Sequence, residues 1–367
     1  MPIKKFIKPA IALVFFSVIV DLYSVEQHIT LQSVKTEAIE TISPPVEITP
    51  EIQPKVENRT TLLFTGDINL GRCVAKVSIR AGDYSYPFQY VAEKLRSADI
   101  TVGSLDGSIS DESPPQDCPD SMNLIGPENM VEGLQFAGFD VITVATNHVK
   151  DCGNEGFLCD NSSFLDTVDT LTQAGIQPVG GGRNLSEART PVVIENQGIR
   201  FAFLGIDQIN ERVWATETAP GVAPVSSQYV EQVKGDIVAA RSIADVVIVL
   251  PQWGTEYSMQ PDDIQRQWAA EFINAGATLI IGNHPHIIQP METFANGTVF
   301  YALGNFVFDQ GQNFRREGLV VQATFKGSQL ESLQLLPVNI NYYTYQPQWT
   351  EEPATQKILT RVQDLSH

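Results

Sequence analysis

Two histidines separated by one residue are the strongest sign of chemistry in the sequence. His284 and His286 lie in LIIGNHPHIIQ, where the apolar run 279–281 predicts a buried strand and the Gly-Asn pair after it predicts a turn. His148 ends the run VITVATNH in the same way. The chain has five histidines, and three of them at predicted strand ends favour metal binding or catalysis over the alternative that they are merely polar loop residues.

Four further polar side chains stand at the ends of predicted strands: Asp67, Asp106, Asn147 and Gln252. Open α/β sheets bring the carboxyl ends of their strands to one edge, so we expect these side chains beside the three histidines. Carboxylates and imidazoles that converge in this way suit one or two divalent ions such as zinc, manganese or iron. Such ions lower the pKa of a bound water, and two of them hold the attacking and leaving oxygens. Taken singly, Asp67 could instead cap the next segment and Asn147 could make a turn.

Composition excludes some functions. The 367 residues can form one large domain or two small ones, and 43% hydrophobic content is enough for a substantial core. The 24 Lys and Arg residues against 43 Asp and Glu give a net charge of -19, which repels nucleic acid and anionic lipid headgroups. We therefore expect no nucleic-acid partner. An anionic substrate needs a local cation, such as a bound metal, to reverse the field at its site.

Residues 1–25 carry a targeting signal. Three lysines precede an apolar run of eleven residues, 10–20, which is short for a membrane-spanning helix and suits a signal peptide. No A-x-A cleavage pattern follows, so a signal peptide and an N-terminal membrane anchor both stay open. In either case the positive end stays inside and the rest of the chain is exported. We expect an extracytoplasmic protein, membrane-anchored or secreted.

Residues 26–59 have no sustained apolar periodicity and contain four prolines: Pro44, Pro45, Pro50 and Pro54. Such a proline-containing linker suits a semi-stiff spacer that holds a domain away from a membrane, and a poorly ordered tail without a task is an equal alternative. We expect the folded domain to span 60–367.

The four cysteines are an even set in an expected oxidising compartment, which favours disulfides over a thiolate metal site. Three pairings are possible. We favour Cys152 with Cys159, because they lie close in sequence across a glycine-containing loop, and this leaves Cys73 with Cys118.

Helices and strands alternate along most of the expected domain. Several amphipathic segments end at Ala-Gly before a new apolar segment, where glycine takes the left-handed conformation cheaply. Helices are predicted at 87–97, 130–137, 164–174, 230–240, 264–272 and 354–365, and strands at 61–65, 100–105, 141–144, 246–250 and 279–281. This alternation argues for an α/β fold. The last third has strand patterns at 298–303, 318–325 and 330–340 without intervening helices, so we expect part of the sheet system to be antiparallel.

Six motifs occur in order along the chain: GDINLGR at 66–72, ATNHVKDCGNEG at 145–156, GGGRNLSEA at 180–188, QWGTEY at 252–257, GNHPHIIQ at 282–289 and YALGNFVF at 301–308. Together they resemble the motifs of the CapA family of poly-γ-glutamate capsule biosynthesis proteins, which is related to calcineurin-like metallophosphoesterases. The resemblance covers about residue 61 to the C-terminus. It implies an α/β, metallophosphoesterase-like sandwich of two mixed β-sheets flanked by helices, in a protein that is usually exported or membrane-anchored.

The resemblance also assigns roles to the polar residues. Asp67 matches the first metal-site aspartate of the family, and His284 and His286 match its paired histidines. Asn147 and His148 match an Asn-His pair, in which the asparagine is a metal ligand and the histidine stabilises the transition state or protonates the leaving group.

Two positions depart from the family pattern. The usual Asn-Leu-Glu is Ser-Leu-Asp here, so Asp106 keeps a carboxylate on a shorter arm. The usual His-Trp-Gly is Gln-Trp-Gly, so Gln252 replaces an imidazole with an amide, a poor ligand for zinc or iron. Three states of the site are then possible. In order of preference, they are one metal ion with retained hydrolysis, two metal ions with a changed set of ligands, and an inactive site kept for binding.

Two functions of different class follow from the resemblance. The chain would be a metal-dependent hydrolase that attacks a phosphoester or the amide of a glutamate-type polymer through a metal-bound hydroxide, with His148 as acid. Alternatively it would be a non-catalytic, membrane-tethered component that binds or guides an anionic surface polymer. Arg72 and Arg183 would supply positive charge to such a substrate, or would form ordinary structural salt bridges. Other capsule-synthesis membrane proteins are possible partners.

Overall fold

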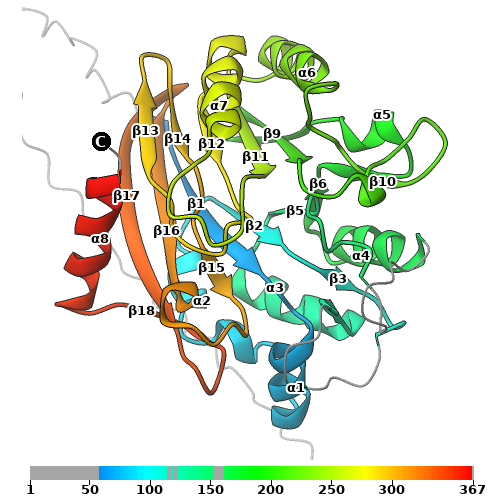
Figure 1. Ribbon diagram of the computed structural model, residues 1–367, viewed down its shortest axis with the longest axis vertical. Helices are drawn as coiled ribbons and strands as arrows, with labels where there is room; N and C mark the ends of the chain where they lie inside the picture. The colour runs from blue at the N-terminus through cyan, green and yellow to red at the C-terminus, as the bar shows by residue number, and fades with distance from the viewer. Residues whose placement is uncertain (1–57, 114–117, 119–122, 152–160, 366–367) are drawn as a thin grey trace, which may run out of the picture. The chain divides into compact units, whose positions relative to one another are not determined.

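A computed structural model describes residues 58–113, 118, 123–151 and 161–365 (Figure 1). The predicted signal or anchor at 1–25 and nearly all of the linker at 26–59 lie outside these residues. Within the described part of the chain, no helix is long and apolar enough to span a membrane.

The first of two large sheets is mixed. Its strand order is β18-β17-β16-β1-β2-β5-β6, and β15 (Asn305–Val307) also pairs with β1. The parallel strands are β1 (Arg59–Ile68), β2 (Ile100–Leu105), β5 (Val141–Thr143) and β6 (Gln177–Val179). The antiparallel strands are β16 (Glu317–Lys326), β17 (Gln329–Ile340) and β18 (Pro347–Trp349). The predicted antiparallel pairing in the last third of the chain is therefore confirmed.

The second large sheet is mixed too, with the strand order β13-β14-β12-β11-β9-β8. Its strands are β8 (Val192–Asn196), β9 (Ile199–Asp207), β11 (Val246–Gln252), β12 (Leu279–Ile281), β13 (Met291–Phe294) and β14 (Gly297–Phe300). Strands β9, β11, β12 and β14 run parallel, whereas β8 and β13 form antiparallel hairpins with their neighbours. The β8–β9 hairpin was not predicted from the sequence. Its turn residues Gln197 and Gly198 both have positive φ.

Shorter elements connect the two sheets. The remaining strands are β3 (Ser108–Ile109), β4 (Ile125–Gly126), β7 (Gly181–Gly182) and β10 (Gly221–Val222). The α-helices are α1 (Arg72–Ala81), α2 (Ala92–Leu95), α3 (Val131–Ala137), α4 (Ser162–Gln173), α5 (Leu185–Ala188), α6 (Val230–Ile243), α7 (Asp263–Ala275) and α8 (Ala354–Leu365). Single 3-10 turns are η1 (Tyr86–Phe88), η2 (Glu128–Met130), η3 (Glu211–Val213) and η4 (Asn313–Arg316).

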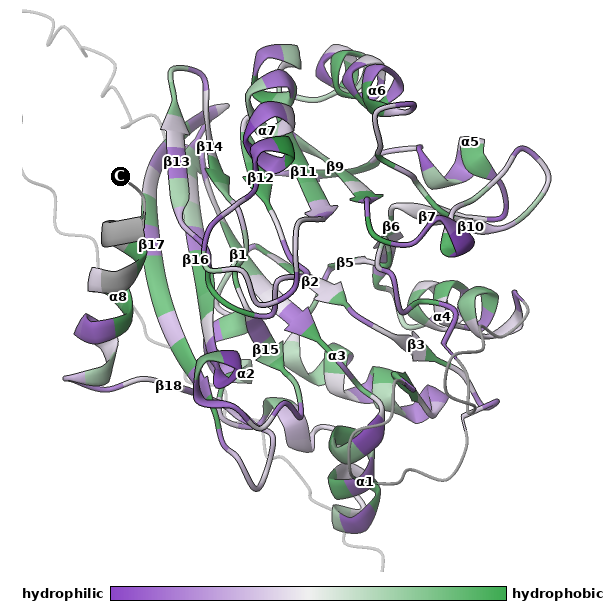
Figure 2. Cartoon of the chain, in the orientation of Figure 1, coloured by the Kyte–Doolittle hydropathy of each residue, from purple (hydrophilic) through white to green (hydrophobic). Residues whose placement is uncertain are grey.

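The two sheets pack face to face over one shared core. Leu62 and Phe64 of β1 lie in this core with Ile248 and Leu250 of β11. Because successive side chains of a strand point to opposite faces, Leu63 of β1 packs instead among the helices on the outer side of its sheet. The outer face of the second sheet is covered by α6 and α7, and Figure 2 shows hydrophobic and hydrophilic residues on different parts of α7. This arrangement is the predicted sandwich of two mixed sheets flanked by helices.

Local signals set several helix ends as predicted. Asp262 and Gln265 form a reciprocal capping box at the start of α7. Gly276, which ends α7, has a φ of 117°, a conformation that favours glycine. Helix α8 also forms as predicted, and it packs against β17 with Ile358 and Val362 buried (Figure 1).

The predicted helix at 87–97 is wrong in length. The segment forms the 3-10 turn η1 and the four-residue helix α2 instead. The side chain of Asp83 accepts hydrogen bonds from the backbone of Ser85 (2.8 Å) and from Gln89 Nε2 (2.7 Å). These bonds stabilise a turn in competition with a continuous helix.

Candidate functional site

Six predicted metal ligands meet where the strands of the two sheets end. The first sheet contributes Asp67 from β1, Asp106 from the end of β2 and Asn147 from the loop after β5, and the second sheet contributes Gln252 from β11 and His284 and His286 from the loop after β12. All six are buried. Hydrogen bonds and close contacts, given below, join them into one group, called the strand-end cluster from here on.

Asp67 is fixed by hydrogen bonds from both sheets. Ser104 Oγ donates to its Oδ1 (3.2 Å), and the backbone nitrogen of His284 donates to its Oδ2 (3.2 Å). The residue before it is glycine because the strand passes close to another segment: a Cβ at Gly66 would lie 1.9 Å from the Gly304 carbonyl oxygen. The GD pair of the first motif therefore serves both backbone packing and placement of the carboxylate.

His286 lies between the two carboxylates. Its Nδ1 is 3.5 Å from Asp67 Oδ2, and its Nε2 is 3.8 Å from Asp106 Oδ2. The Nδ1 atom also lies 2.9 Å from Asn305 Oδ1, which orients the ring. His284 and His286 have φ values of 97° and 57°. Non-glycine residues rarely adopt such values, and such strain is concentrated at functional sites.

Gln252 extends the cluster from the second sheet to the first. Its Nε2 donates to Asn147 Oδ1 (3.2 Å) and to Asp106 Oδ1 (3.4 Å), while its Oε1 is buried without a hydrogen-bond partner. The amide group thus places a positive N–H edge between two oxygens. A cation would satisfy the same oxygens.

His148 lies beside Asp151, with 2.6 Å between its Nδ1 and Asp151 Oδ2. Burial lowers the pKa of His148, but the charge of Asp106 and the hydrogen bond and charge of Asp151 outweigh burial and raise this pKa to about 9. The imidazole is therefore protonated at neutral pH. A protonated imidazole held by a carboxylate suits proton donation to a leaving group.

The strand-end carboxylates resist ionisation. Burial and the neighbouring charge of Asp106 raise the pKa of Asp67 well above its ordinary value. Burial, partly opposed by the positive charge of His148, raises the pKa of Asp106 to about 6. Burial lowers the pKa of His284 and His286 to about 3, so both imidazoles stay neutral and keep a lone pair for a metal.

The donor set fits a divalent metal ion by its chemistry. Asp106 Oδ2, Gln252 Oε1 and His284 Nδ1 are buried without a hydrogen-bond partner, and each has a lone pair that a cation would satisfy. A cation would also offset the repulsion between Asp67 and Asp106. Across residues 58–113, 118, 123–151 and 161–365, however, no three His, Cys, Asp or Glu side chains already stand in a metal-holding arrangement.

A cavity of about 320 Å³ opens onto the cluster, and His148 and His286 line it. Arg72, predicted to contact substrate, lines the cavity too, but its guanidinium is paired with Asp309 through Nε (3.1 Å to Oδ2) and through its terminal nitrogen. Arg183 is not part of this lining. It is exposed and pairs with Asp169 (2.7 Å), which agrees with the alternative of a structural salt bridge.

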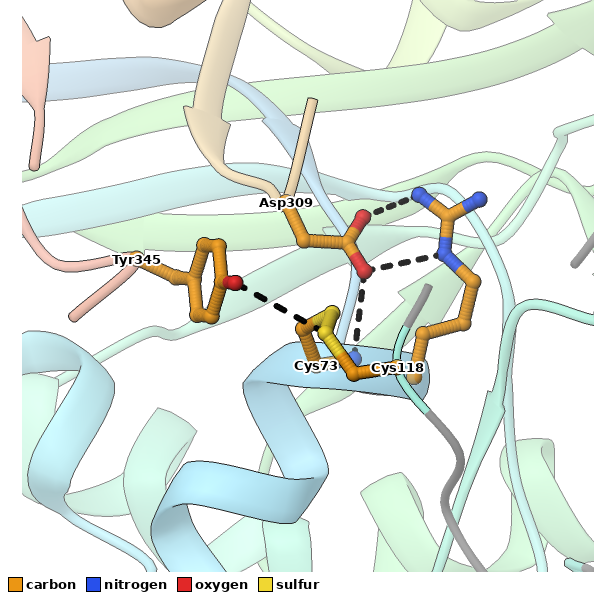
Figure 3. The surroundings of a disulfide bond; sticks show 5 residues. Cys73, Cys118, Asp309 and Tyr345 are labelled. Carbon is orange, nitrogen blue, oxygen red and sulfur yellow. Dashed lines mark hydrogen bonds and ion pairs between the residues drawn. A yellow bond between two sulfur atoms is a disulfide. The ribbon is translucent and has the colours of Figure 1, made fainter. Parts of the chain in front are cut away.

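A disulfide joins Cys73 to Cys118 next to this ion pair (Figure 3). Asp309 accepts a hydrogen bond from the backbone nitrogen of Cys73 (3.1 Å), so the disulfide and the Arg72–Asp309 pair share one anchor at the start of α1. The predicted pairing of Cys73 with Cys118 is thus present. The predicted partners Cys152 and Cys159 lie outside the described residues.

One buried acid near the cluster, Asp207, was not among the predicted site residues. Asp207 ends β9, and burial raises its pKa to about 7, although Asn210 and Trp214 donate hydrogen bonds to it. Asn210 Nδ2 also donates to the backbone oxygen of Asn147 (3.3 Å). The signal was available, because the apolar run FAFLGI ends at this aspartate just as other runs end at Asp67 and Asp106.

Comparisons with known proteins place the chain in a wider context. The model of the family described as "Bacterial capsule synthesis protein PGA_cap" matches residues 61–310. The "PGA biosynthesis protein CapA" of Bacillus subtilis is 31% identical over 301 residues, covering 82% of this chain and 76% of that protein. The "Capsule biosynthesis protein CapA" of Bacillus anthracis is 30% identical, covering 79% and 69%. Among solved structures, a putative 5'-nucleotidase from Staphylococcus aureus is similar at 15% identity and a TM-score of 0.46, covering 83% of this chain and 58% of that one.

Proposed function

The chain belongs to the bacterial capsule synthesis protein family PGA_cap, and from that membership we propose that it acts in the biosynthesis of poly-γ-glutamate or a related surface polymer. The proposal places it outside the cytoplasm, secreted or held at the membrane by residues 1–25, whose lysines and apolar run support export. Its partners would be an anionic polymer or a phosphoester and other capsule-synthesis membrane proteins.

The proposed reaction is metal-dependent hydrolysis. One observation carries it: six side chains from five strand ends converge, and three of their buried polar atoms lack a hydrogen-bond partner. Buried polar groups in proteins are as a rule hydrogen-bonded, so three unpaired oxygen and nitrogen atoms within one cluster favour a bound ligand. A divalent cation, when bound, would act as a Lewis acid and lower the pKa of a water molecule that it contacts.

The chain's own residues would then divide the work. One or two ions of zinc, manganese or iron accept oxygen and imidazole donors. In this chain they would be held by Asp67, Asp106, Asn147, His284 and His286. His148 would donate a proton to the leaving group, with Asp151 keeping it protonated and oriented. The bond broken would be a phosphoester or a glutamyl amide.

Gln252 supports a single-ion version of this site. Its N–H edge already contacts Asp106 and Asn147, where a second cation would otherwise be needed. The same observation favours a second candidate function, a membrane-tethered component that binds an anionic polymer without turnover. The N–H edge of an amide stands where a second cation would lie, and unlike a cation it supplies no Lewis acid.

Elemental mass spectrometry on the full chain tests the proposal. The protein is offered zinc, manganese and iron and compared with a His284→Ala, His286→Ala double variant. We expect about one equivalent of metal in the unaltered chain, and near-background metal in the variant, because two imidazole donors are removed. Both proteins are then assayed with a p-nitrophenyl phosphodiester and with γ-linked oligoglutamate.

The results separate the two candidates. Metal together with turnover that falls at least about 100-fold in His148→Ala, at unchanged metal content, supports the hydrolase. A folded chain that binds no metal above the level of the double variant contradicts the hydrolase, and binding of oligoglutamate without turnover then supports the polymer-binding component.

A further inference from the structure

The cavity beside the strand-end cluster contains a second guanidinium, that of Arg315, that was not among the predicted site residues. Arg315 lies in η4 and lines the cavity together with His148 and His286. Arg72, the other arginine of the lining, is committed to Asp309. Among the described residues, no carboxylate forms an ion pair with Arg315, so its charge is available to a ligand.

Arg315 is held in a fixed position. Its guanidinium carbon lies 3.4 Å from the centre of the Tyr257 ring, a stacked cation–π contact. Its backbone oxygen accepts a hydrogen bond from Asn305 Nδ2 (2.8 Å), and Asn305 Oδ1 contacts His286 Nδ1. The stacking partner is anchored as well, because the backbone nitrogen of Tyr257 donates to the Pro285 oxygen (2.9 Å). Hydrogen bonds therefore connect Tyr257 directly, and Arg315 through Asn305, to the loop that carries the two histidines.

The charge of the cavity lining also favours an anion. Its cations are Arg72, Arg315 and the protonated His148, and its acid is Glu256, which interacts with the Tyr257 hydroxyl. In a chain with a net charge of -19, a guanidinium that lines this cavity supplies a local positive charge that the surface as a whole does not. The planar fork of arginine matches the two oxygens of a carboxylate or a phosphate.

We infer that Arg315, stacked on Tyr257, binds an oxyanion of the substrate, a carboxylate or a phosphate, next to the group on which the strand-end cluster acts. This inference rests on the proposed function, since it takes the cluster as the place where substrate binds. It assigns to Arg315 the substrate contact expected of Arg183, whose guanidinium is paired with Asp169 at the surface.

Isothermal titration calorimetry on the full chain tests this assignment. The probes are a γ-linked glutamate pentamer, the same pentamer with its α-carboxyls amidated, and inorganic phosphate. Arg315→Gln should weaken binding of the recognised anion about 10- to 100-fold, the loss expected when a charged hydrogen bond is removed. The affinity of Arg315→Lys should lie between those of the unaltered chain and of Arg315→Gln, because lysine keeps the charge and loses the planar fork of arginine. The matched control is Arg316→Gln, the neighbouring arginine, which contacts Tyr342 and does not line the cavity; its binding should stay within about threefold of the unaltered chain.

The probes identify the anion and separate this inference from the proposed function. Loss confined to the pentamer with free carboxyls assigns a carboxylate, and loss confined to phosphate assigns a phosphate. The inference is overturned if Arg315→Gln binds the anion as well as the unaltered chain does, or if Arg316→Gln loses as much affinity as Arg315→Gln. It is also overturned if the unaltered chain binds neither anion. A chain that takes up no metal but binds the pentamer through Arg315 leaves the inference standing while the hydrolase fails.

Discussion

At the scale of single residues, the most consequential position is Gln252. Where the family pattern has an imidazole, this side chain presents an N–H edge to Asp106 and Asn147. The amide hydrogen bonds satisfy part of the oxygen set that a second cation would otherwise satisfy. If the cluster holds metal as proposed, it would therefore hold fewer ions than a cluster with an imidazole at this position.

Restoring the imidazole should increase metal binding. In Gln252→His, the new nitrogen replaces the amide between Asp106 and Asn147, so we expect about one more equivalent of zinc or manganese than in the unaltered chain. Elemental mass spectrometry measures the difference, and Gln252→Leu, which offers no donor, serves as the control. Equal metal content in all three proteins would contradict this view of Gln252.

A second prediction concerns the protonation of His148. Asp151 stabilises the imidazolium, so Asp151→Asn should lower the pKa of His148 below its value of about 9. The protonated form of His148 exists only below its pKa. As the pH rises, any step that uses His148 as an acid should therefore be lost at a lower pH in the variant than in the unaltered chain. Histidine NMR titration measures the pKa directly, with the signal assigned by its absence in His148→Gln.

The control for this titration is Asp169→Asn, which removes an exposed carboxylate paired with Arg183. Its His148 pKa should match that of the unaltered chain. If Asp151→Asn leaves the pKa of His148 unchanged, Asp151 does not hold the proton on this ring.

At the scale of elements, the disulfide between Cys73 and Cys118 fixes the start of α1. It ties the helix to a segment 45 residues away, and the backbone of Cys73 also donates to Asp309, the partner of Arg72. One wall of the cavity is therefore held by a covalent bond and by an ion pair together. Strand ends position the side chains of the strand-end cluster, and this tether positions the cavity wall.

Removal of the disulfide should destabilise the domain. In Cys118→Ser the unfolded chain regains the entropy of a 45-residue loop, which corresponds to roughly 4 kcal/mol in the free energy of unfolding. Urea denaturation of the oxidised protein and the variant measures this difference. The Cys73→Ser, Cys118→Ser double variant should behave like the single variant, and a free energy equal to that of the unaltered chain would contradict the expected constraint.

At the scale of the whole molecule, the net charge of -19 opposes the approach of any polyanion. The guanidinium of Arg315 and the proposed cation act only at short range, inside the cavity. Long-range repulsion and local attraction should therefore respond differently to salt.

Association with an anionic polymer should become faster as salt increases. The screening length falls from about 30 Å to about 8 Å between roughly 0.01 and 0.15 M salt, which suppresses repulsion by the surface while contacts inside the cavity persist. Stopped-flow mixing with long-chain poly-γ-glutamate measures the association rate at each salt concentration, and a neutral polymer of equal length is the control. An association rate that falls with salt would mean that local cations dominate the approach.

Much of the site follows from local sequence patterns. Apolar runs followed by one polar residue predicted Asp67, Asp106, Asn147 and the two histidines at strand ends, because strand burial and the turn after it are encoded by neighbouring residues. The same logic applied to FAFLGID would have found Asp207. The predicted length of the helix at 87–97 was wrong. Hydrogen bonds from Ser85 and Gln89 to Asp83 stabilise a turn in competition with a continuous helix, and the apolar spacing does not reveal them.

The sequence by itself determined which side chains stand at strand ends and that the fold alternates helices and strands. Only the tertiary structure decided which arginine faces the cavity, since Arg315 reaches Tyr257 through a contact between residues far apart in the chain, and Arg183 is drawn away by Asp169. It also decided that Gln252 bonds to Asp106 and Asn147, because the two sheets must pack before these side chains meet. Contacts between distant segments depend on the pairing and packing of whole sheets, which no local pattern encodes.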